Sequence, residues 1–251
     1  MLQEIDLKKV CNIAKKAATE VMKIYEKDFN IEYKEDDSPL TEADLKANKI
    51  ICENLQENYP TIPILSEENT NIPYATRKNW EYYWCIDPID GTKEFIKKNG
   101  EFSINIGLIH KDTPVLGVVY APAFNELYYA KKNEGAYKNG EKLPLYINKN
   151  IKEKLTIATS KSHQNSDTAK YINSLQADKK IILIKGSSLK LCMVAEGVAD
   201  IYPRLSPTME WDTAAADAIV RESGKMTYQF NTKKPIVYNK ENLLNPWFMV
   251  N

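Results

Sequence analysis

The sequence predicts a layered α/β protein, in which helices and sheets alternate. Apolar residues recur at helical spacing near the N-terminus, a central region contains short β-type runs, and strand and helix patterns alternate after about residue 152. We expect an N-terminal helix and antiparallel-sheet lobe over residues 1–150 and a C-terminal α/β lobe over residues 151–251. Because no repeat or flexible linker separates these lobes, we expect one folding unit.

Two amphipathic helices are predicted at the N-terminus. The first carries apolar residues at helical spacing, namely Val10, Ile13, Ala14, Ala17, Val21 and Ile24. Pro39 then interrupts the pattern, and Thr41 followed by Asp44 is typical of a capping box that begins the second helix. The apolar stripe of that helix is Leu45, Ile50, Ile51 and Leu55, and Tyr59-Pro60 ends it. We therefore expect two helices before any strand.

The central region is predicted to be an antiparallel meander. Its β-type runs lie at residues 82–86, 102–109, 115–120 and 126–130, with turns at Asn99-Gly100 and Asn139-Gly140. Further strands are expected at 155–158 and 181–184. Two helices complete the chain, one over 188–196 that Gly197 ends and one over 212–222 that Gly224 ends.

Composition excludes several classes of partner. The 34 basic and 34 acidic residues cancel, so no global field attracts nucleic acid polymers or anionic membranes. No stretch approaches the roughly 18 apolar residues of a membrane span, and the charged N-terminus is unlike a signal peptide. Cys11, Cys52, Cys85 and Cys192 lie far apart in apolar contexts, which favours reduced core thiols over a zinc or redox site. We expect a soluble cytoplasmic protein, with its oligomeric state left open.

The segment Asp87-Pro88-Ile89-Asp90-Gly91-Thr92 directly follows an apolar strand. Strand ends in α/β proteins are frequent ligand sites, and Pro88 and Gly91 restrict the backbone enough to aim two carboxylates and one carbonyl inward. Residues 92–94 then begin a helical turn whose free N–H groups suit a phosphate. The alternative is an ordinary surface turn, since Asp-Gly is common turn chemistry.

Two other interpretations of this segment fit less well. In an EF-hand, aligning Gly91 with the loop glycine places Ile86 first and Lys97 where a bidentate glutamate is required. A haloacid-dehalogenase-type phosphatase has its two aspartates two positions apart on the first strand. Here Asp87 and Asp90 are three apart and lie well inside the chain.

Two more acidic positions support a cation site. Glu67 follows the apolar run 62–65, and Asp212 begins the last predicted helix. Taken alone, Ser66-Glu67-Glu68 reads as a solvated turn and Asp212 as a helix N-cap. Together with Asp87 and Asp90, they predict a cage of oxygen ligands for hard cations such as Mg2+. Such a cage indicates phosphate chemistry.

The combination resembles the inositol monophosphatase superfamily of Mg2+-dependent, lithium-sensitive phosphatases over nearly the whole chain. The motifs that carry the resemblance are 87–92 (DPIDGT), 211–216 (WDTAAA), 41–44 (TEAD) and 65–68 (LSEE). Four other segments look like the CysQ-type 3'(2'),5'-bisphosphate nucleotidases of this superfamily, at 91–96 (GTKEFI), 99–102 (NGEF), 186–190 (GSSLK) and 244–246 (LNP). The resemblance implies a fold of alternating helix and sheet layers, αβαβα, as in inositol monophosphatase and fructose-1,6-bisphosphatase.

The resemblance also implies site roles. Two or three Mg2+ ions would be held by Glu67, Asp87, the Ile89 carbonyl, Asp90 and Asp212, with Asp44 reaching a further ion or its water. Thr92, with Asp44 or Glu67, would orient and deprotonate the attacking water. The expected substrate contacts are Glu67, Ile89, Asp90, Gly91, Thr92, Lys93, His163, Ser187, Lys190, Arg204 and Asp212. Arg204 also stands out by itself, because the chain has only three arginines and a guanidinium fork suits a second phosphate.

The implied reaction is hydrolysis of adenosine 3',5'-bisphosphate to AMP and phosphate, a step linked to sulfur metabolism. A further substrate would be 3'-phosphoadenylyl sulfate, which would give adenylyl sulfate. The alternative within the superfamily is an inositol or sugar phosphate phosphatase. A non-catalytic nucleotide or metal sensor is disfavoured, because no ligand position is missing.

Overall fold

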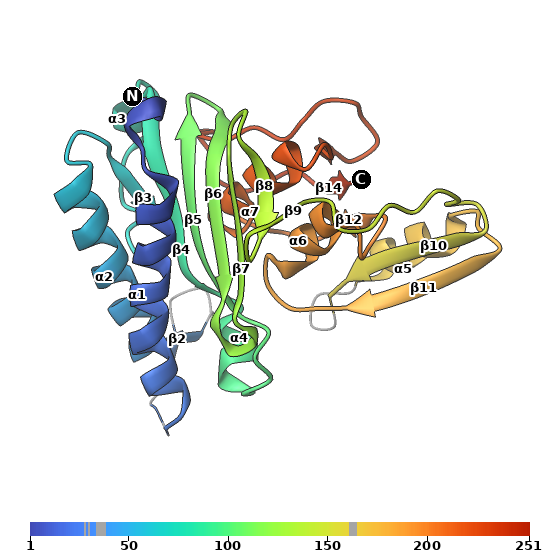
Figure 1. Ribbon diagram of the computed structural model, residues 1–251, viewed down its shortest axis with the longest axis horizontal. Helices are drawn as coiled ribbons and strands as arrows, with labels where there is room; N and C mark the ends of the chain where they lie inside the picture. Colours follow the sequence, from blue (N-terminus) through green and yellow to red (C-terminus); the bar gives the residue numbers. More distant parts are fainter. Residues whose placement is uncertain (28, 30, 34–38, 161–164) are drawn as a thin grey trace.

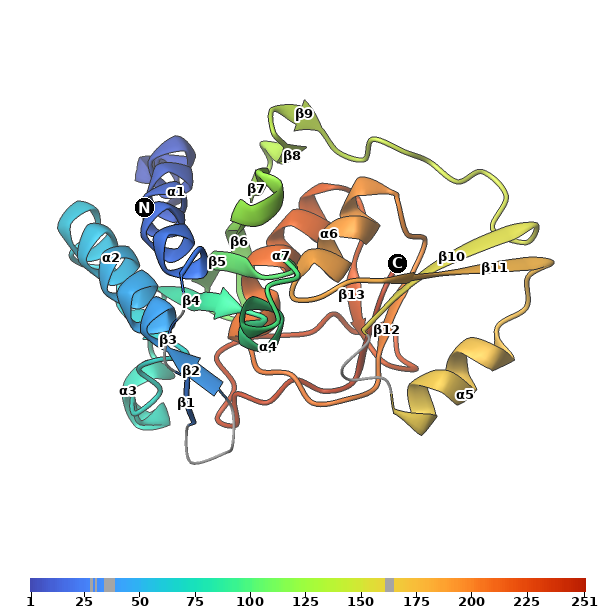
Figure 2. The same cartoon turned by 90° about the horizontal axis from the view of Figure 1, so that it is seen from below.

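The computed structural model describes residues 1–251 except 28, 30, 34–38 and 161–164. Its layers follow one another across the molecule: two N-terminal helices, a seven-stranded sheet, a second helical pair, small sheets, and an outer helix (Figures 1 and 2). This arrangement confirms the predicted α/β class with alternating layers.

The N-terminal layer contains α1 (Leu7–Tyr25) and α2 (Glu42–Asn58), which confirms both predicted helices. A short 3₁₀ turn, η1 (Leu2–Glu4), precedes them. The expectation of two helices before any strand is wrong, because β1 (Ile31–Tyr33) and β2 (Pro39–Thr41) form an antiparallel pair between α1 and α2. Three-residue strands are too short to leave a periodic signal. Leu45 was also wrongly placed in the buried stripe, since its side chain is 51% exposed.

The central sheet has the strand order β3-β4-β5-β6-β7-β8-β9. Its strands are β3 (Ile64–Ser66), β4 (Tyr82–Asp90), β5 (Ser103–His110), β6 (Thr113–Ala121), β7 (Glu126–Lys131), β8 (Gly135–Lys138) and β9 (Glu141–Lys142). The predicted antiparallel meander is confirmed from β4 onward, whereas β3 pairs with β4 in parallel. Three short helical turns, α3 (Tyr74–Arg77), α4 (Thr92–Ile96) and η2 (Pro122–Phe124), connect these strands.

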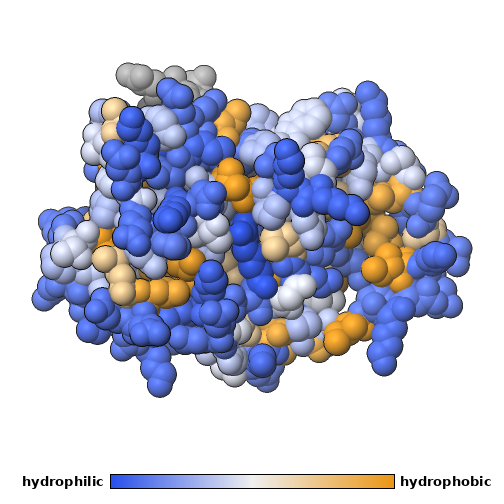
Figure 3. Space-filling view, turned by 90° about the horizontal axis from the view of Figure 1, so that it is seen from above, coloured by the Kyte–Doolittle hydropathy of each residue, from blue (hydrophilic) through white to orange (hydrophobic). Residues whose placement is uncertain are grey.

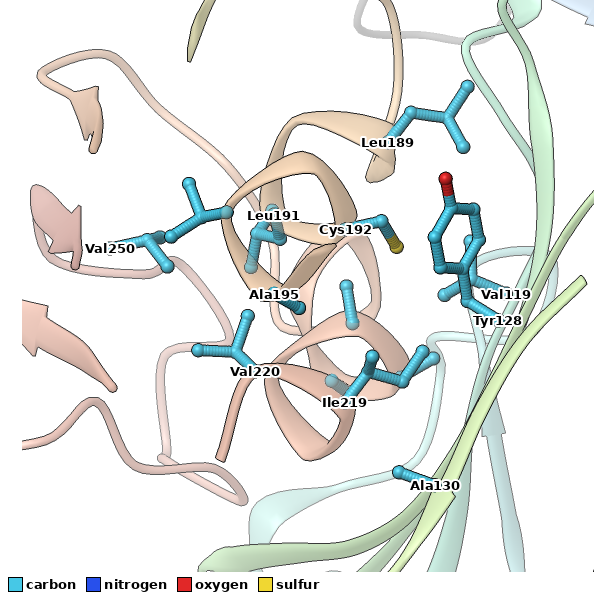
Figure 4. Close-up of a cluster of buried hydrophobic side chains, with 14 of the residues drawn as sticks. Val119, Tyr128, Ala130, Leu189, Leu191, Cys192, Ala195, Ile219, Val220 and Val250 are labelled. Carbon is cyan, nitrogen blue, oxygen red and sulfur yellow. The ribbon is translucent and has the colours of Figure 1, made fainter. Parts of the chain in front are cut away.

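Alternation along β4 divides the core into two halves. Trp84 and Ile86 pack in the cluster with α1 and α2, while Tyr83 and Cys85 belong to the cluster on the opposite face. That opposite face is covered by α6 (Leu189–Glu196) and α7 (Trp211–Glu222). Figure 4 shows their side chains between the sheet and the C-terminal strand.

The C-terminal region adds two small sheets. β10 (Lys154–Thr159) pairs in parallel with β11 (Lys179–Ile184), and the three strands β12 (Tyr202–Arg204), β14 (Phe248–Val250) and β13 (Thr227–Gln229) are antiparallel in that order. The outer helix α5 (Ser166–Ser174) was not predicted, because it buries only Thr168 and Ile172 and so has almost no apolar stripe. Gly197 and Gly224 have positive φ after α6 and α7, as their predicted ends require.

All four cysteines are free thiols; Cys11, Cys85 and Cys192 are buried as predicted, whereas Cys52 is only partly buried at the edge of the core. Within the part of the chain that the structure describes, every helix is too short or too polar to span a bilayer. The face in Figure 3 is largely hydrophilic, with apolar side chains in small separate groups.

Candidate active site

A cavity of about 250 Å³ lies where β3 and β4 end and where α4, α6 and α7 begin. The predicted site residues that line it are Glu67, Asp87, Ile89, Asp90, Gly91, Thr92, Lys93, Ser187, Lys190, Arg204 and Asp212. Asp44 lies behind the wall and hydrogen-bonds Thr92. His163 lies outside the described residues. Eleven of the predicted residues, from distant parts of the sequence, therefore share one cavity.

The parallel pairing of β3 with β4 brings Glu67 and Asp87 together. Ser66 is in register with Ile86, and the Glu67 N–H donates to the Ile86 carbonyl at 3.1 Å. The carboxyl ends of parallel strands meet at one edge of a sheet, so the next residue of each strand projects there. Period-two alternation also gives Asp87 the orientation of Tyr83 and Cys85, toward α6 and α7.

The segment from Asp87 to Asp90 is part of a strand, and not the ordinary surface turn that was its alternative interpretation. β4 continues to Asp90, with a register shift between Asp87 and Asp90 against β5. Such an irregularity re-aims side chains without ending the pairing. Gly91 then adopts φ +92°, where a Cβ would also lie 3.1 Å from the Glu101 carbonyl oxygen, and α4 starts at Thr92. The positive φ is what requires glycine here, and the close carbonyl oxygen adds a smaller steric constraint.

Asp90 and Asp212 are each held by hydrogen bonds. Ser188 donates to Asp90 Oδ2 from its backbone N–H, its Oγ lies 2.6 Å from that oxygen, and Asn105 Nδ2 lies 3.3 Å from it. Asp212 Oδ2 accepts from the Met209 N–H at 2.9 Å. The N-cap interpretation of Asp212 is wrong, because Glu210 occupies that position and Asp212 lies inside the first turn of α7.

Burial and mutual repulsion raise the pKa values of these carboxyl groups. The pKa of Asp87 is raised well above its usual range by burial, then by the charges of Glu67, Asp90 and Asp212. Burial and the nearby Asp90 charge raise the pKa of Asp212 to about 8. Burial also raises the pKa of Asp90, although the Lys190 charge and the hydrogen bonds from Ser188 oppose the effect. Concentrated negative charge of this kind needs a cationic partner or protons.

The donor set suits a hard divalent cation. Asp87 Oδ1 is buried without a hydrogen-bond partner, and such orphaned acceptors are uncommon in native proteins. Carboxylate and carbonyl oxygens are the ligands that Mg2+ takes. Across the described ranges, however, no group of three or more Asp, Glu, His or Cys side chains has metal-ligating geometry as it stands. The carboxylates nevertheless share one cavity, and their mutual repulsion without a cation favours the wider separation.

Thr92 and Asp44 form a second functional unit. The capping box of α2 occupies Asp44 Oδ2, which accepts from the Thr41 N–H at 2.8 Å and the Thr41 hydroxyl at 2.7 Å. Asp44 Oδ1 accepts from Thr92 Oγ1 at 3.2 Å. Burial raises the pKa of Asp44, which makes it a stronger proton acceptor than an exposed carboxylate.

Two cationic side chains, Lys190 and Arg204, also line the cavity and are called its cationic wall. Lys190 Nζ donates to the Ser187 carbonyl at 2.6 Å, and burial lowers the pKa of Lys190 to about 8. Arg204 donates to the Pro207 carbonyl at 3.0 Å, while its Nε is buried without a hydrogen-bond partner. Tyr202 is a buried core residue whose ring centroid lies 5.6 Å from Lys190 Nζ, and it also lines the cavity. This wall can bind a second anionic group.

Sequence reasoning missed several residues of the site. The additional lining residues are Pro39, Glu94, Ser160, Gly186, Leu191, Thr208, Thr213 and Phe248. Asn105 and Ser188, which hold Asp90, were also not selected. Asn105 did leave a signal, since a polar side chain between Ile104 and Ile106 in a core strand needs a partner.

Comparison with known proteins identifies relatives. The model of the inositol monophosphatase family matches residues 3–246. The 3'(2'),5'-bisphosphate nucleotidase CysQ of Salmonella typhimurium (strain LT2) is 41% identical over 246 residues, which cover 97% of this chain and 98% of that protein. CysQ from Bacteroides thetaiotaomicron has a crystal structure that superimposes with a TM-score of 0.87 at 41% identity, covering 98% of this chain and 96% of its own. An IMPase of Thermotoga maritima gives a TM-score of 0.79 at 28% identity, covering 96% of this chain and 89% of its own.

Proposed function

The chain belongs to the inositol monophosphatase family, and on that premise we propose that it is a 3'(2'),5'-bisphosphate nucleotidase. Its substrate is adenosine 3',5'-bisphosphate, which it hydrolyses to AMP and phosphate. The enzyme also takes 3'-phosphoadenylyl sulfate, which gives adenylyl sulfate. The observation that carries the proposal is the single cavity whose lining includes Glu67, Asp87, Asp90, Asp212, Thr92, Lys190 and Arg204, with Asp44 hydrogen-bonded to Thr92 behind it. Similarity of about 41% to CysQ over nearly the whole chain supports the substrate class.

The proposed metal ligands are Glu67, Asp87, the Ile89 carbonyl, Asp90 and Asp212, which would hold two or three Mg2+ ions. When bound, the ions supply positive charge to the phosphate and lower the pKa of a water molecule. The protein contributes the placement. Strand alternation determines the direction of the Asp87 side chain, and the pairing of β3 with β4 determines the position of Glu67. Asp212 is positioned by the first turn of α7.

We assign the positioning of the attacking water to Thr92. Its Oγ1 lies 3.2 Å from both Asp44 Oδ1 and the Ile89 carbonyl oxygen, and donation to the charged carboxylate leaves a lone pair of Oγ1 to accept a hydrogen bond from water. The proton released as the water attacks phosphorus passes to Asp44 through Thr92, or to Glu67. The bond between phosphorus and the 3' oxygen breaks as the water oxygen bonds to phosphorus, and the 3' oxygen takes a proton from solvent to become the 3' hydroxyl of AMP, so no covalent enzyme intermediate is needed.

The second phosphate of the substrate is assigned to the cationic wall. Arg204 offers a planar fork and Lys190 a compact charge, and both are buried, so their attraction for an anion is weakly screened. Ser187, Gly91 and Lys93 complete the pocket around the nucleotide. A contact from His163, a cytoplasmic location, lithium inhibition and the two-lobe division stay predictions.

The test compares phosphate release from adenosine 3',5'-bisphosphate and from inositol monophosphate under identical conditions with Mg2+. We expect much higher kcat/KM for the bisphosphate. Faster turnover of inositol monophosphate would favour an inositol or sugar phosphate phosphatase instead. The variant Asp87→Asn, purified in parallel, is the control for contaminating phosphatase, because a contaminant's activity survives the substitution.

A further inference from the structure

We propose that Ser188 and Asn105 are positioning residues that orient Asp90, so that its Oδ1 and not its Oδ2 is offered to a divalent cation. The inference rests on the proposed function, which makes Asp90 a metal ligand. Three hydrogen-bonding groups contact Asp90 Oδ2: the Ser188 N–H, the Ser188 Oγ at 2.6 Å and the Asn105 Nδ2 at 3.3 Å. None of these groups contacts Oδ1. An oxygen surrounded by donors is a poor metal ligand, so the carboxylate is held for monodentate binding.

Asn105 occupies a core position that packing alone does not explain. Its side chain is fully buried on β5, where the neighbouring Ile104 and Ile106 pack toward α1 and α2. Asn105 is in register with Asp87, and its Nδ2 also lies 2.9 Å from Ser188 Oγ. The amide orientation is determined, because rotating it would place a carbonyl oxygen against the Asp90 carboxylate. Burying an amide costs free energy, and here only its donors are used, on Asp90 and Ser188, whereas its Oδ1 is buried without a hydrogen-bond partner; an amide at this position therefore serves the groups that its Nδ2 contacts.

Ser188 connects two of the proposed ligands. Its side chain is buried just before α6, and Oγ lies 2.6 Å from both Asp90 Oδ2 and the Asp212 carbonyl oxygen. Asn105 donates to the same Oγ. These contacts join β4, β5, α6 and α7 at one hydroxyl group. A shift of Ser188 therefore changes the separation of Asp90 from the segment that carries Asp212.

The competing explanation is purely structural: the hydroxyl group and the amide serve to fix α6 against the sheet. The two explanations differ in what the substitutions change. A structural role predicts a lower melting temperature with unaltered metal affinity once the protein is folded. A positioning role predicts weaker metal binding in protein that remains folded, since partners behind a metal ligand typically contribute 10–100-fold to affinity.

The experiment measures Mn2+ affinity of the full chain without substrate, by electron paramagnetic resonance of the free ion, for Ser188→Ala and Asn105→Ala. We expect about a 10–100-fold weaker Kd in each variant with an unchanged number of sites. The effects should not multiply in the double variant, because both residues act on the same oxygen. In turnover, the Mg2+ concentration for half-activation should rise more than kcat falls.

Ser103→Ala is the matched control. Ser103 is buried on the same strand, is in register with Asp90, and its Oγ has no hydrogen-bond partner. We expect its Mn2+ affinity to equal that of the unaltered protein. An equal loss in Ser103→Ala, or unchanged affinity in folded Ser188→Ala, overturns the proposal. If Asn105→Ala fails to fold, Ser188→Ala decides alone, because it removes a single oxygen atom.

The same measurements separate this inference from the proposed function. If the unaltered protein binds Mn2+ and the variants bind it weakly, but the bisphosphate is not hydrolysed, the nucleotidase assignment fails and the positioning role stands. If hydrolysis occurs while the variants keep full affinity, the positioning role fails alone.

Discussion

Replacing Gly117 by alanine should displace α7 and with it Asp212. Gly107 and Gly117 are paired across β5 and β6, and both face α7. A Cβ at Gly117 would lie 2.0 Å from the Ala215 carbonyl oxygen and 3.0 Å from the Ala218 Cβ. Helix backbone cannot rotate away as a side chain can, so α7 must move. A Cβ at Gly107 would meet its nearest atom, the Ala215 nitrogen, at 3.1 Å, which a shift of a few tenths of an ångström relieves.

The two substitutions should therefore change the free energy of unfolding by different amounts. Overpacking a core costs about 1–3 kcal/mol. Replacing glycine in an allowed conformation recovers about 0.4–1 kcal/mol through the unfolded chain. For Gly117→Ala the loss dominates; central values of about 2 and about 0.7 kcal/mol leave a net loss of about 1.3 kcal/mol, and at about 2–4 °C per kcal/mol the melting temperature should fall by roughly 3–5 °C. For Gly107→Ala the small overpacking cost and the gain through the unfolded chain nearly cancel. Because a displacement near 1 Å can reduce turnover about 100-fold, Gly117→Ala should also lose most activity.

The first measurement is the melting temperature in the presence of a chelator, so that metal binding does not mask the change in stability. The second is kcat at saturating Mg2+. Gly107→Ala is the control with the same chemical change on the neighbouring strand. An equal or larger effect of Gly107→Ala, or an unchanged melting temperature and kcat in Gly117→Ala, would show that α7 does not transmit this contact to the site.

Three further outcomes are expected. Asp90→Asn should weaken Mg2+ affinity and turnover severely with an unchanged circular dichroism spectrum; retained activity removes Asp90 from the metal site. Arg204→Ala should raise KM for adenosine 3',5'-bisphosphate far more than KM for a monophosphate, and equal increases mean that Arg204 does not bind the second phosphate. Burial and Asp90 raise the pKa of Asp212 to about 8 from 3.8, so in metal-free protein its contribution to stability is present below pH 3.8 and is lost as pH rises through 8. The rise in melting temperature that Mg2+ causes should accordingly be larger at pH 8 than at pH 5; a difference of the opposite sign contradicts the assignment.

The elements that sequence predicted well have long periodic patterns or explicit boundary residues. α1 follows from its apolar spacing, and α2 begins where the Thr41–Asp44 capping box places it. β1 and β2 are too short to show a period, and α5 buries too little apolar surface to show a stripe. Local signals therefore predicted most of the two large layers on either side of the central sheet, but few of the small elements beyond them.

The site was predicted for a different reason. Glu67, Asp87, Asp90 and Asp212 were selected as motif residues, and their meeting in one cavity depends on pairings that no local pattern encodes: β3 beside β4 in parallel, and α7 against the two glycines. The same pairings explain what was missed. Asn105 is a lone polar residue in an apolar strand, and only the register with Asp87 and the approach of Ser188 show which groups it serves. A residue that acts through another residue is hard to recognise in a single sequence, because its role depends on a contact that only the fold creates.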